Sequence, residues 1–237
     1  MNENIKEIIK AFKVDLDSSK NQIMLKPIAR SFNNQAHQIN EAAEKIHELI
    51  KNAPYSNDNI VLKRNEIKEA FFSPFKPQLK NAQVFLSHSH ADRNKALEVK
   101  DYLESQTKRK VFIDSLFWDY KDDVLNELAK YDCISRIEDA FTLILRESLQ
   151  DMIEKCPYFV FLQSSNSVSF NQNLLKITYS AWIYEELKIA HSISKGYLTL
   201  SFEQEQGLEI KIENDTSPFL KSFETITLNE LSQQINS

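Results

Sequence analysis

Glycine is the scarcest informative residue in this chain. The 237 residues include only two glycines, Gly196 and Gly207. The G-x-G-x-x-G and Walker A loops need closely spaced glycines, because there the backbone itself must approach the phosphates. The sequence therefore contains neither of these phosphate-binding loops. If the protein handles a nucleotide, it must do so by another arrangement.

Cysteines and long apolar runs are also few. The two cysteines, Cys133 and Cys156, do not make a disulfide framework, which suits a reducing compartment. No run approaches the ~18 apolar residues of a membrane-spanning helix. The start, MNENIKEIIKAF, lacks the apolar core of a secretory signal. We therefore expect a cytoplasmic protein that does not bind membranes.

Basic residues are also fewer than acidic ones, 29 Lys and Arg against 34 Asp and Glu. The formal net charge is −5, and residues 81–237 hold 16 Lys and Arg against 24 Asp and Glu. Residues 1–80 hold 13 against 10. Neither part carries the strong basic field of a non-specific nucleic-acid binder, so we expect no nucleic-acid partner.

Helical patterns dominate residues 1–80. Segments 5–16, 28–50 and 59–72 have apolar residues at helical spacing, and a proline-punctuated stretch, SPFKP, follows them. Their apolar faces are small for an independent core. We predict a small all-helical N-terminal region over 1–80 that serves in dimerisation or regulation, and a second domain over 81–237.

Strands and helices alternate after residue 82. The predicted strands are AQVFLS (82–87), KVFID (110–114), YFVFLQ (158–163) and GYLTLSF (196–202). Amphipathic helical segments lie between them. This order predicts an α/β fold, a flavodoxin-like parallel sheet with helices on both faces. Ligands bind beyond the carboxyl ends of the strands in such sheets, where SHSHAD, DSLFWD and SSNSVS are expected.

One carboxylate sits unexpectedly in an apolar stripe. In the predicted helix that begins near Trp182, the neighbours of Glu186 at helical spacing are all apolar, whereas Glu185 has Lys188 within reach. A buried carboxylate is costly unless it is paired, and such sites are often functional. The alternative is a first-turn glutamate that the helix dipole favours.

The run His88-x-His90-x-Asp92 allows a metal interpretation. It matches most of the H-x-H-x-D-H run of metallo-β-lactamase-like hydrolases, but Arg93 stands where that run needs its next histidine. Only His191 remains downstream, too few ligands for a binuclear site. A metal-dependent hydrolase is thus the weakest alternative, and a strand end that caps the next helix is the simplest one.

Four segments together resemble Toll/interleukin-1 receptor (TIR) domains. VFLSHSHAD (84–92) is similar to the first conserved box of that family, and VFIDSLFW (111–118) to its second strand and the start of the BB loop. YFVFLQSSNSVS (158–169) resembles a later strand with its serine-rich exit, and SAWIYEEL (180–187) resembles the S-x-W-x-x-x-E-L motif. The resemblance spans about residues 82–205, leaves 1–80 uncovered, and selects Glu186 as the glutamate of the motif.

The resemblance implies an enzymatic activity. Some TIR domains split the nicotinamide–ribose bond of NAD+ in bacterial antiphage defence, and these carry a glutamate at the position that matches Glu186. Other TIR domains only assemble with one another, so a non-catalytic scaffold is the alternative. In the enzymatic interpretation Glu186 is catalytic and NAD+ is a substrate. No cofactor or metal is implied.

The resemblance also implies surroundings for the substrate. The expected substrate-binding residues are Ser87, His88, Ser89, Asp114, Phe117, Trp118 and Trp182. The serines suit sugar or phosphate oxygens, and the aromatic rings suit stacking on nicotinamide or adenine, with core packing as the alternative for both tryptophans. Implied partners are further copies of the chain, which meet through the TIR domain, and a downstream effector that senses the product.

Overall fold

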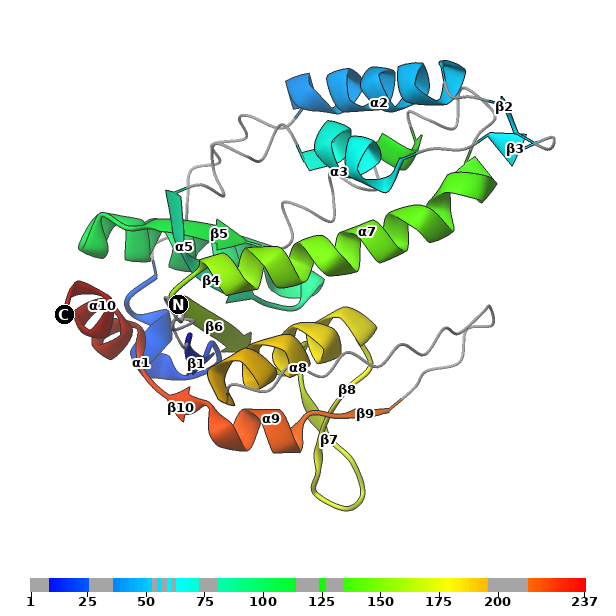
Figure 1. The fold of residues 1–237 in the computed structure, drawn as a ribbon. Helices are drawn as coiled ribbons and strands as arrows, with labels where there is room; N and C mark the ends of the chain where they lie inside the picture. Colours follow the sequence, from blue (N-terminus) through cyan, green and yellow to red (C-terminus); the bar gives the residue numbers. More distant parts are fainter. Residues whose placement is uncertain are drawn as a thin grey trace, which may run out of the picture. The chain divides into compact units, whose positions relative to one another are not determined.

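A five-stranded parallel sheet forms the centre of the larger of two compact units (Figure 1). The computed structural model describes residues 9–25, 36–52, 55–56, 59–60, 63–72, 81–113, 124–126, 134–195 and 213–237. One unit comprises residues 1–28, 82–114 and 150–237, and the other comprises 29–81 and 115–149. The predicted α/β class with a flavodoxin-like parallel sheet is confirmed.

Three of the predicted strands form as expected. They are β4 (Ala82–Ser87), β5 (Lys110–Ile113) and β6 (Tyr158–Gln163), and they pair in parallel. Their central residues are buried on both faces of the sheet, as the continuous apolar runs indicate. Phe85 of β4 and Phe159 of β6 stack with ring centroids 5.8 Å apart.

The strand order creates a switch point between β4 and β6. The sheet runs β10-β1-β6-β4-β5, so the connection from β4 leads outward to β5, and the chain then returns to the other side of β4 for β6. Strands β5, β4 and β6 thereby follow the 2-1-3 portion of the flavodoxin-like order. The connections that leave the carboxyl ends of β4 and β6 run in opposite directions there, and ligands of open α/β sheets bind at such a point.

Residues 10–15 correct the predicted N-terminal region. The segment expected to be helical is β1 (Lys10–Asp15), an interior strand that pairs with β6 and with β10 (Glu224–Thr225). Phe12, Val14 and Leu16 are buried, and they alternate with polar residues. This period of two is a strand pattern that outweighs the helical spacing read over 5–16. The predicted boundary at residue 80 is therefore wrong, since β1 belongs to the sheet.

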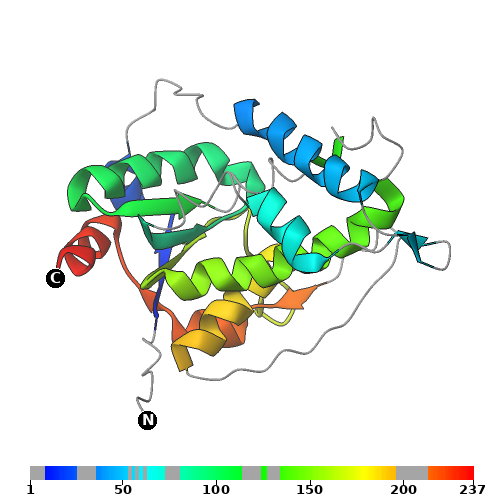
Figure 2. The same cartoon turned by 45° about the horizontal axis from the view of Figure 1, so that its top comes forward.

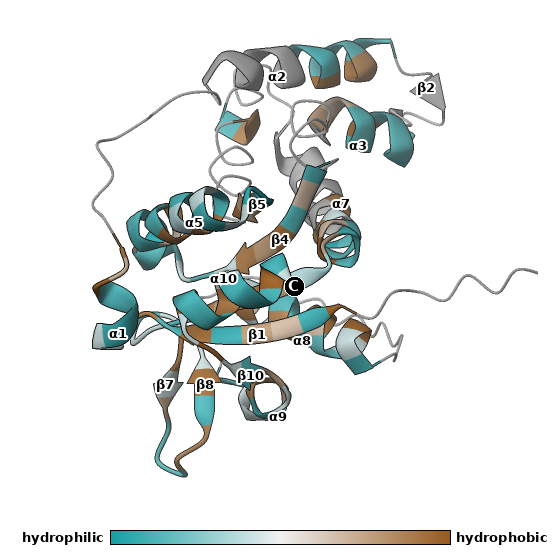
Figure 3. Cartoon of the chain, turned by 90° about the vertical axis from the view of Figure 1, so that its left-hand side faces the viewer, coloured by the Kyte–Doolittle hydropathy of each residue, from teal (hydrophilic) through white to brown (hydrophobic). Residues whose placement is uncertain are grey.

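Helices cover both faces of this sheet (Figures 1 and 3). α5 (Arg93–Thr107) and α10 (Leu228–Asn236) lie on one face, where Tyr158 of β6 donates a hydrogen bond to the Gln234 carbonyl. α8 (Ala181–Lys195) and α9 (Ser217–Ser222) lie on the other, where Lys13 donates to the Leu220 carbonyl at 2.5 Å. A capping box of Thr227 and Glu230 begins α10.

Shorter elements complete the larger unit. α1 (Ser19–Gln22) follows β1, and a 3-10 turn, η2 (His90–Asp92), joins β4 to α5. A second, antiparallel sheet has the order β7-β8-β9, formed by β7 (Ser169–Phe170), β8 (Lys176–Thr178) and β9 (Asn214–Asp215). β8 leads almost directly into α8.

The smaller unit is mainly helical. α2 (Ala36–Lys51) lies beside α3 (Arg64–Phe72) (Figure 2). In the connection that leads from α2 to α3, β2 (Tyr55–Ser56) pairs with β3 (Asn59–Ile60). Ile46, Ile67 and Phe71 are buried there. The predicted helices over 28–50 and 59–72 are thus confirmed in large part. α7 (Ile134–Lys155) runs through residues of both units.

Two of the sequence predictions concern residues that the structure does not describe. The predicted strand 196–202 and the loop 115–123 lie outside the described residues. Among the residues that the structure describes, no helix is both long enough and apolar enough to span a bilayer.

Candidate functional site

The candidate site lies where the switch point meets the start of α8. Ser87 ends β4, residues 164–168 leave β6, and α8 begins at Ala181, after the hairpin of β7 and β8. A hydrogen bond from the Ile183 N–H to Ser180 Oγ (3.3 Å) helps to begin this helix. Three segments distant in sequence therefore converge at the carboxyl edge of the sheet.

Glu186 is the central residue of this site. Its side chain is 0% exposed, and Ser87 Oγ donates a hydrogen bond to Glu186 Oε2 at 2.5 Å. On the same helix Ile183, Leu187 and Ala190 are buried with it, as the apolar stripe predicts. A carboxylate in this position is oriented by a fixed hydroxyl donor, and the surrounding protein shields it from bulk water.

Glu185 occupies a different environment although it is the adjacent residue. Its side chain is 21% exposed, and it lies 3.9 Å from Lys188, the ion partner that helical spacing predicts. The two glutamates thus separate into a buried and a solvated one. That difference makes Glu185 a natural control for Glu186.

The residues that follow Ser87 at the end of β4 differ in how exposed they are. His88 is 3% exposed, Ser89 is half-buried, and His90 is exposed. Trp182, in the first turn of α8, is half-buried. The predicted residues Asp114, Phe117 and Trp118 lie outside the described residues. The structure thus brings Ser87 and Glu186 into direct contact.

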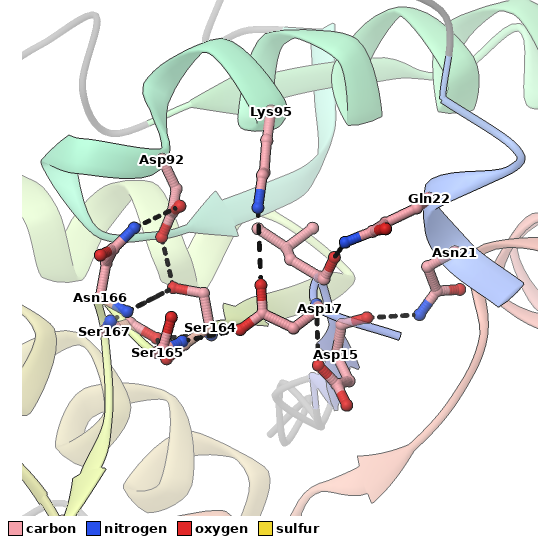
Figure 4. Close-up of polar contacts among 11 residues, drawn as sticks. Asp15, Asp17, Asn21, Gln22, Asp92, Lys95, Ser164, Ser165, Asn166 and Ser167 are labelled. Atoms are coloured by element: carbon pink, nitrogen blue, oxygen red, sulfur yellow. Dashed lines mark hydrogen bonds and ion pairs between the residues drawn. The ribbon is translucent and has the colours of Figure 1, made fainter. Parts of the chain in front are cut away.

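Asp92 organises the segment that leaves β6 (Figure 4). Its carboxylate is 3% exposed and accepts hydrogen bonds from Ser164 Oγ and from Asn166 Nδ2, the latter at 2.9 Å. Ser164 Oγ also accepts from the backbone N–H groups of Asn166 and Ser167. This network pins residues 164–167 to the start of α5, beside the switch point.

Asp17, two residues after the end of β1, adds a contact at the same edge. It accepts a hydrogen bond from the Ser165 N–H at 2.9 Å and lies 3.5 Å from Lys95 Nζ (Figure 4). The hydrogen bond from Ser165 lowers the pKa of Asp17, and the charge of Lys95 lowers it further. The exits of β1 and β6 are therefore held together by a carboxylate.

The geometry does not favour the metal interpretation. Asp92 uses both carboxylate oxygens on Ser164 and Asn166, and His90 faces solvent while His88 is buried. No three His, Cys, Asp or Glu side chains in the described ranges are grouped so that they could hold a metal ion. The described geometry therefore lends no support to the run 88–92 as one ligand set.

Several residues of this site carry little signal in the sequence. Asp17 directly follows the segment 5–16, whose spacing favours a helix, although the alternation around Val14 signals a strand that ends near it. The serine-rich exit of β6 stands out in the sequence, but its individual contacts do not. Nothing in the sequence indicates that Asp92 would form hydrogen bonds with Ser164 and Asn166.

Replacing Asp92 by asparagine is expected to destabilise the fold by about 1–3 kcal/mol, because a buried acceptor that serves two donors is changed into a group with its own donors. Chemical denaturation of the variant tests this expectation. Asp101, an exposed acid on α5, provides the control as Asp101→Asn, which should change stability by less than about 0.5 kcal/mol. Equal stability of both variants would contradict the assigned role of Asp92.

The chain was compared with known proteins in three ways. A scan against protein-family models, a search of curated proteins and a search of solved structures each found no match.

Proposed function

We propose that this protein is a TIR-like enzyme that cleaves the nicotinamide–ribose bond of NAD+. The observation that carries the proposal is the buried Glu186, which accepts a hydrogen bond from Ser87 at the β4/β6 switch point. The four motifs that resemble TIR domains support it, because their glutamate is the one that the fold buries. The proposal places the activity in the cytoplasm, in bacterial antiphage defence signalling.

The chemistry requires a single carboxylate. Glycosidases use a second carboxyl group to protonate a poor leaving group. Nicotinamide in NAD+ is a cationic pyridinium and leaves as a neutral molecule, so no general acid is needed. Positive charge then develops on the ribose, and Glu186 stabilises that oxocarbenium-like cation. The acceptor that completes the reaction is water, a group of the same molecule, or a third molecule, which gives hydrolysis, cyclisation or ADP-ribosyl transfer.

Ser87 fills a role that differs from the predicted one. The resemblance implies that Ser87 binds sugar or phosphate oxygens, but its side chain is 0% exposed and its hydroxyl donates to Glu186. We infer that Ser87 positions the carboxylate. His88, Ser89 and Trp182 remain candidates for contact with NAD+. Since Glu186 is fully buried, substrate entry requires a local opening at this edge of the sheet.

The variant Ser87→Ala is expected to lower kcat about 10- to 100-fold with a smaller change in KM, because Glu186 loses the donor that fixes its orientation. Steady-state measurement of nicotinamide release gives both constants. Ser87→Thr keeps the hydroxyl and should restore part of the rate. An unchanged kcat in Ser87→Ala would contradict the positioning role.

Partners follow from the same proposal. Enzymatic TIR domains often complete the pocket of one protomer with the BB loop of a neighbour, and the matching segment here is 115–123. We therefore propose homo-oligomers with higher turnover per protomer, and an effector that senses the product. The test of the function is incubation of the purified full chain with NAD+, followed by identification of the products by mass spectrometry.

A further inference from the structure

An exposed asparagine on the loop that leaves β6 presents an unused acceptor. Asn166 lies in the segment 164–168, and its side-chain Nδ2 donates to the buried carboxylate of Asp92 at 2.9 Å. The residue is exposed, and no described residue donates a hydrogen bond to its Oδ1. In Figure 4 this oxygen points away from Asp92. The side chain is thus held by its nitrogen, and its oxygen stays open to a ligand.

The orientation of this amide follows from Asp92. A carboxylate accepts hydrogen bonds and offers none, so only the NH2 end of an amide can bond to it. The other oxygen of Asp92 already accepts from Ser164 Oγ. Asp92 is 3% exposed, and the loss of one donor would leave part of a buried acceptor unsatisfied. The flipped amide is therefore disfavoured, and Asn166 Oδ1 is a fixed hydrogen-bond acceptor.

The loop that carries Asn166 uses its own backbone donors. Ser164 Oγ accepts from the N–H groups of Asn166 and Ser167, and Ser167 Oγ accepts from the Ser164 N–H at 2.9 Å. The Ser165 N–H donates to Asp17 at 2.9 Å. The loop therefore offers none of these N–H groups to a phosphate. What it presents in a fixed position is an acceptor, which selects for a ligand with a hydrogen-bond donor.

Asn166 and Glu186 approach the switch point from different sides. Glu186 belongs to α8, which covers one face of the sheet, whereas Asp92 leads into α5, which covers the other (Figures 1 and 3). Ser87 ends β4, and the loop of Asn166 follows β6, the strand beside it. A ligand at this switch point must cross the edge of the sheet to reach both side chains. The ligand group that meets Asn166 is therefore distant from the bond next to Glu186.

We propose that Asn166 binds the half of NAD+ that does not react, and that its Oδ1 accepts a hydrogen bond from the adenosine. This inference rests on the proposed function and adds a binding subsite to it. The bond to be cleaved lies in the nicotinamide half, and the adenosine lies beyond the diphosphate. The diphosphate oxygens are acceptors, which another acceptor does not bind. The ribose hydroxyls and the amino group of adenosine are donors that match Asn166 Oδ1.

Kinetics with a full and a truncated substrate test the inference. Nicotinamide mononucleotide contains the bond to be cleaved but lacks the adenosine. Asn166→Ala should raise KM for NAD+ about 3- to 10-fold with kcat nearly unchanged, because it removes one hydrogen bond that ground state and transition state share. With nicotinamide mononucleotide, its kcat/KM should stay within about twofold of the wild type. This second arm separates a binding role from a structural one, because a disordered loop would affect both substrates.

A second asparagine provides the control. Asn236, at the end of α10, is exposed, and its Nδ2 donates to the Gln106 carbonyl at 3.3 Å. Asn236→Ala should match the wild type with both substrates. Nicotinamide hypoxanthine dinucleotide, which has an oxo group in place of the adenine amino group, then identifies the donor. If the donor is the amino group, Asn166→Ala loses the preference of the wild type for NAD+. If it is a ribose hydroxyl, Asn166→Ala weakens both dinucleotides equally.

Three kinetic results would overturn the inference. They are equal losses with NAD+ and the mononucleotide, an unchanged KM for NAD+ in Asn166→Ala, and the same rise of KM in Asn236→Ala. If the wild type cleaves neither substrate, the proposed function fails, and calorimetric titration with ADP-ribose decides the inference separately. The same titration decides it if only the mononucleotide resists cleavage. The wild type must then bind ADP-ribose several-fold more tightly than Asn166→Ala, and equal or absent binding would overturn the subsite.

Discussion

Replacing Glu186 by glutamine is expected to lower the rate of nicotinamide release by about a thousandfold or more. Glutamine has nearly the same shape, and its carbonyl can still accept the hydrogen bond from Ser87 Oγ. The variant loses only the negative charge that would stabilise the cationic ribose. Folding should therefore persist, which circular dichroism and the melting temperature can verify.

The neighbouring glutamate supplies the control for this experiment. Glu185 is partly exposed and lies near Lys188, so Glu185→Gln removes a charge on the same helix without reaching the buried site. We expect its rate to stay within about threefold of the wild type, because a surface ion pair contributes little. Equal losses in both variants, or full activity in Glu186→Gln, would contradict the assignment of Glu186.

The second large effect concerns stability and the place of β1. Phe12 is 3% exposed on β1, and its ring lies 6.4 Å from that of Tyr158 on β6. Phe12→Ala should destabilise the protein by about 3–5 kcal/mol, the usual cost of deleting a buried phenyl ring. Urea denaturation measures the free energy of unfolding of the variant and of the wild type.

A matched control keeps the same chemical change on the surface. Phe170→Ala deletes a phenyl ring that is 66% exposed, so its cost should be below about 0.5 kcal/mol when measured at low protein concentration. A chain that starts at Asn81 lacks β1 and should fail to fold cooperatively. If that shortened chain folded, or if Phe12→Ala melted like the wild type, residues 10–15 would not be an interior strand.

The sequence predicted the main fold well where the apolar pattern is strong. Strands β4 and β6 are short continuous apolar runs between helical segments, and such runs are typical of buried parallel strands. The helical spacing around Glu186 also predicted its burial correctly. These features depend on local pattern alone, which is what one sequence displays.

Other features depend on contacts between distant segments. β1 is an interior strand only because β6 and β10 lie on either side of it, and a six-residue segment with mixed spacing does not reveal such neighbours. The contact of Asp92 with Ser164 and Asn166 joins two loops that meet only in the fold. The exposed hairpin between β7 and β8 was equally hidden, since exposure is a property of the folded surface.

The central claim is that the protein breaks the nicotinamide–ribose bond of NAD+, and product analysis tests it most directly. The full-length wild type and Glu186→Gln are incubated with NAD+ at several protein concentrations, and nicotinamide and its partner product are identified by mass spectrometry. We predict that the wild type releases nicotinamide together with ADP-ribose, a cyclic isomer or an ADP-ribosyl adduct, and that Glu186→Gln does not. Intact NAD+ in the wild-type samples at every concentration, with the protein folded, would contradict the claim.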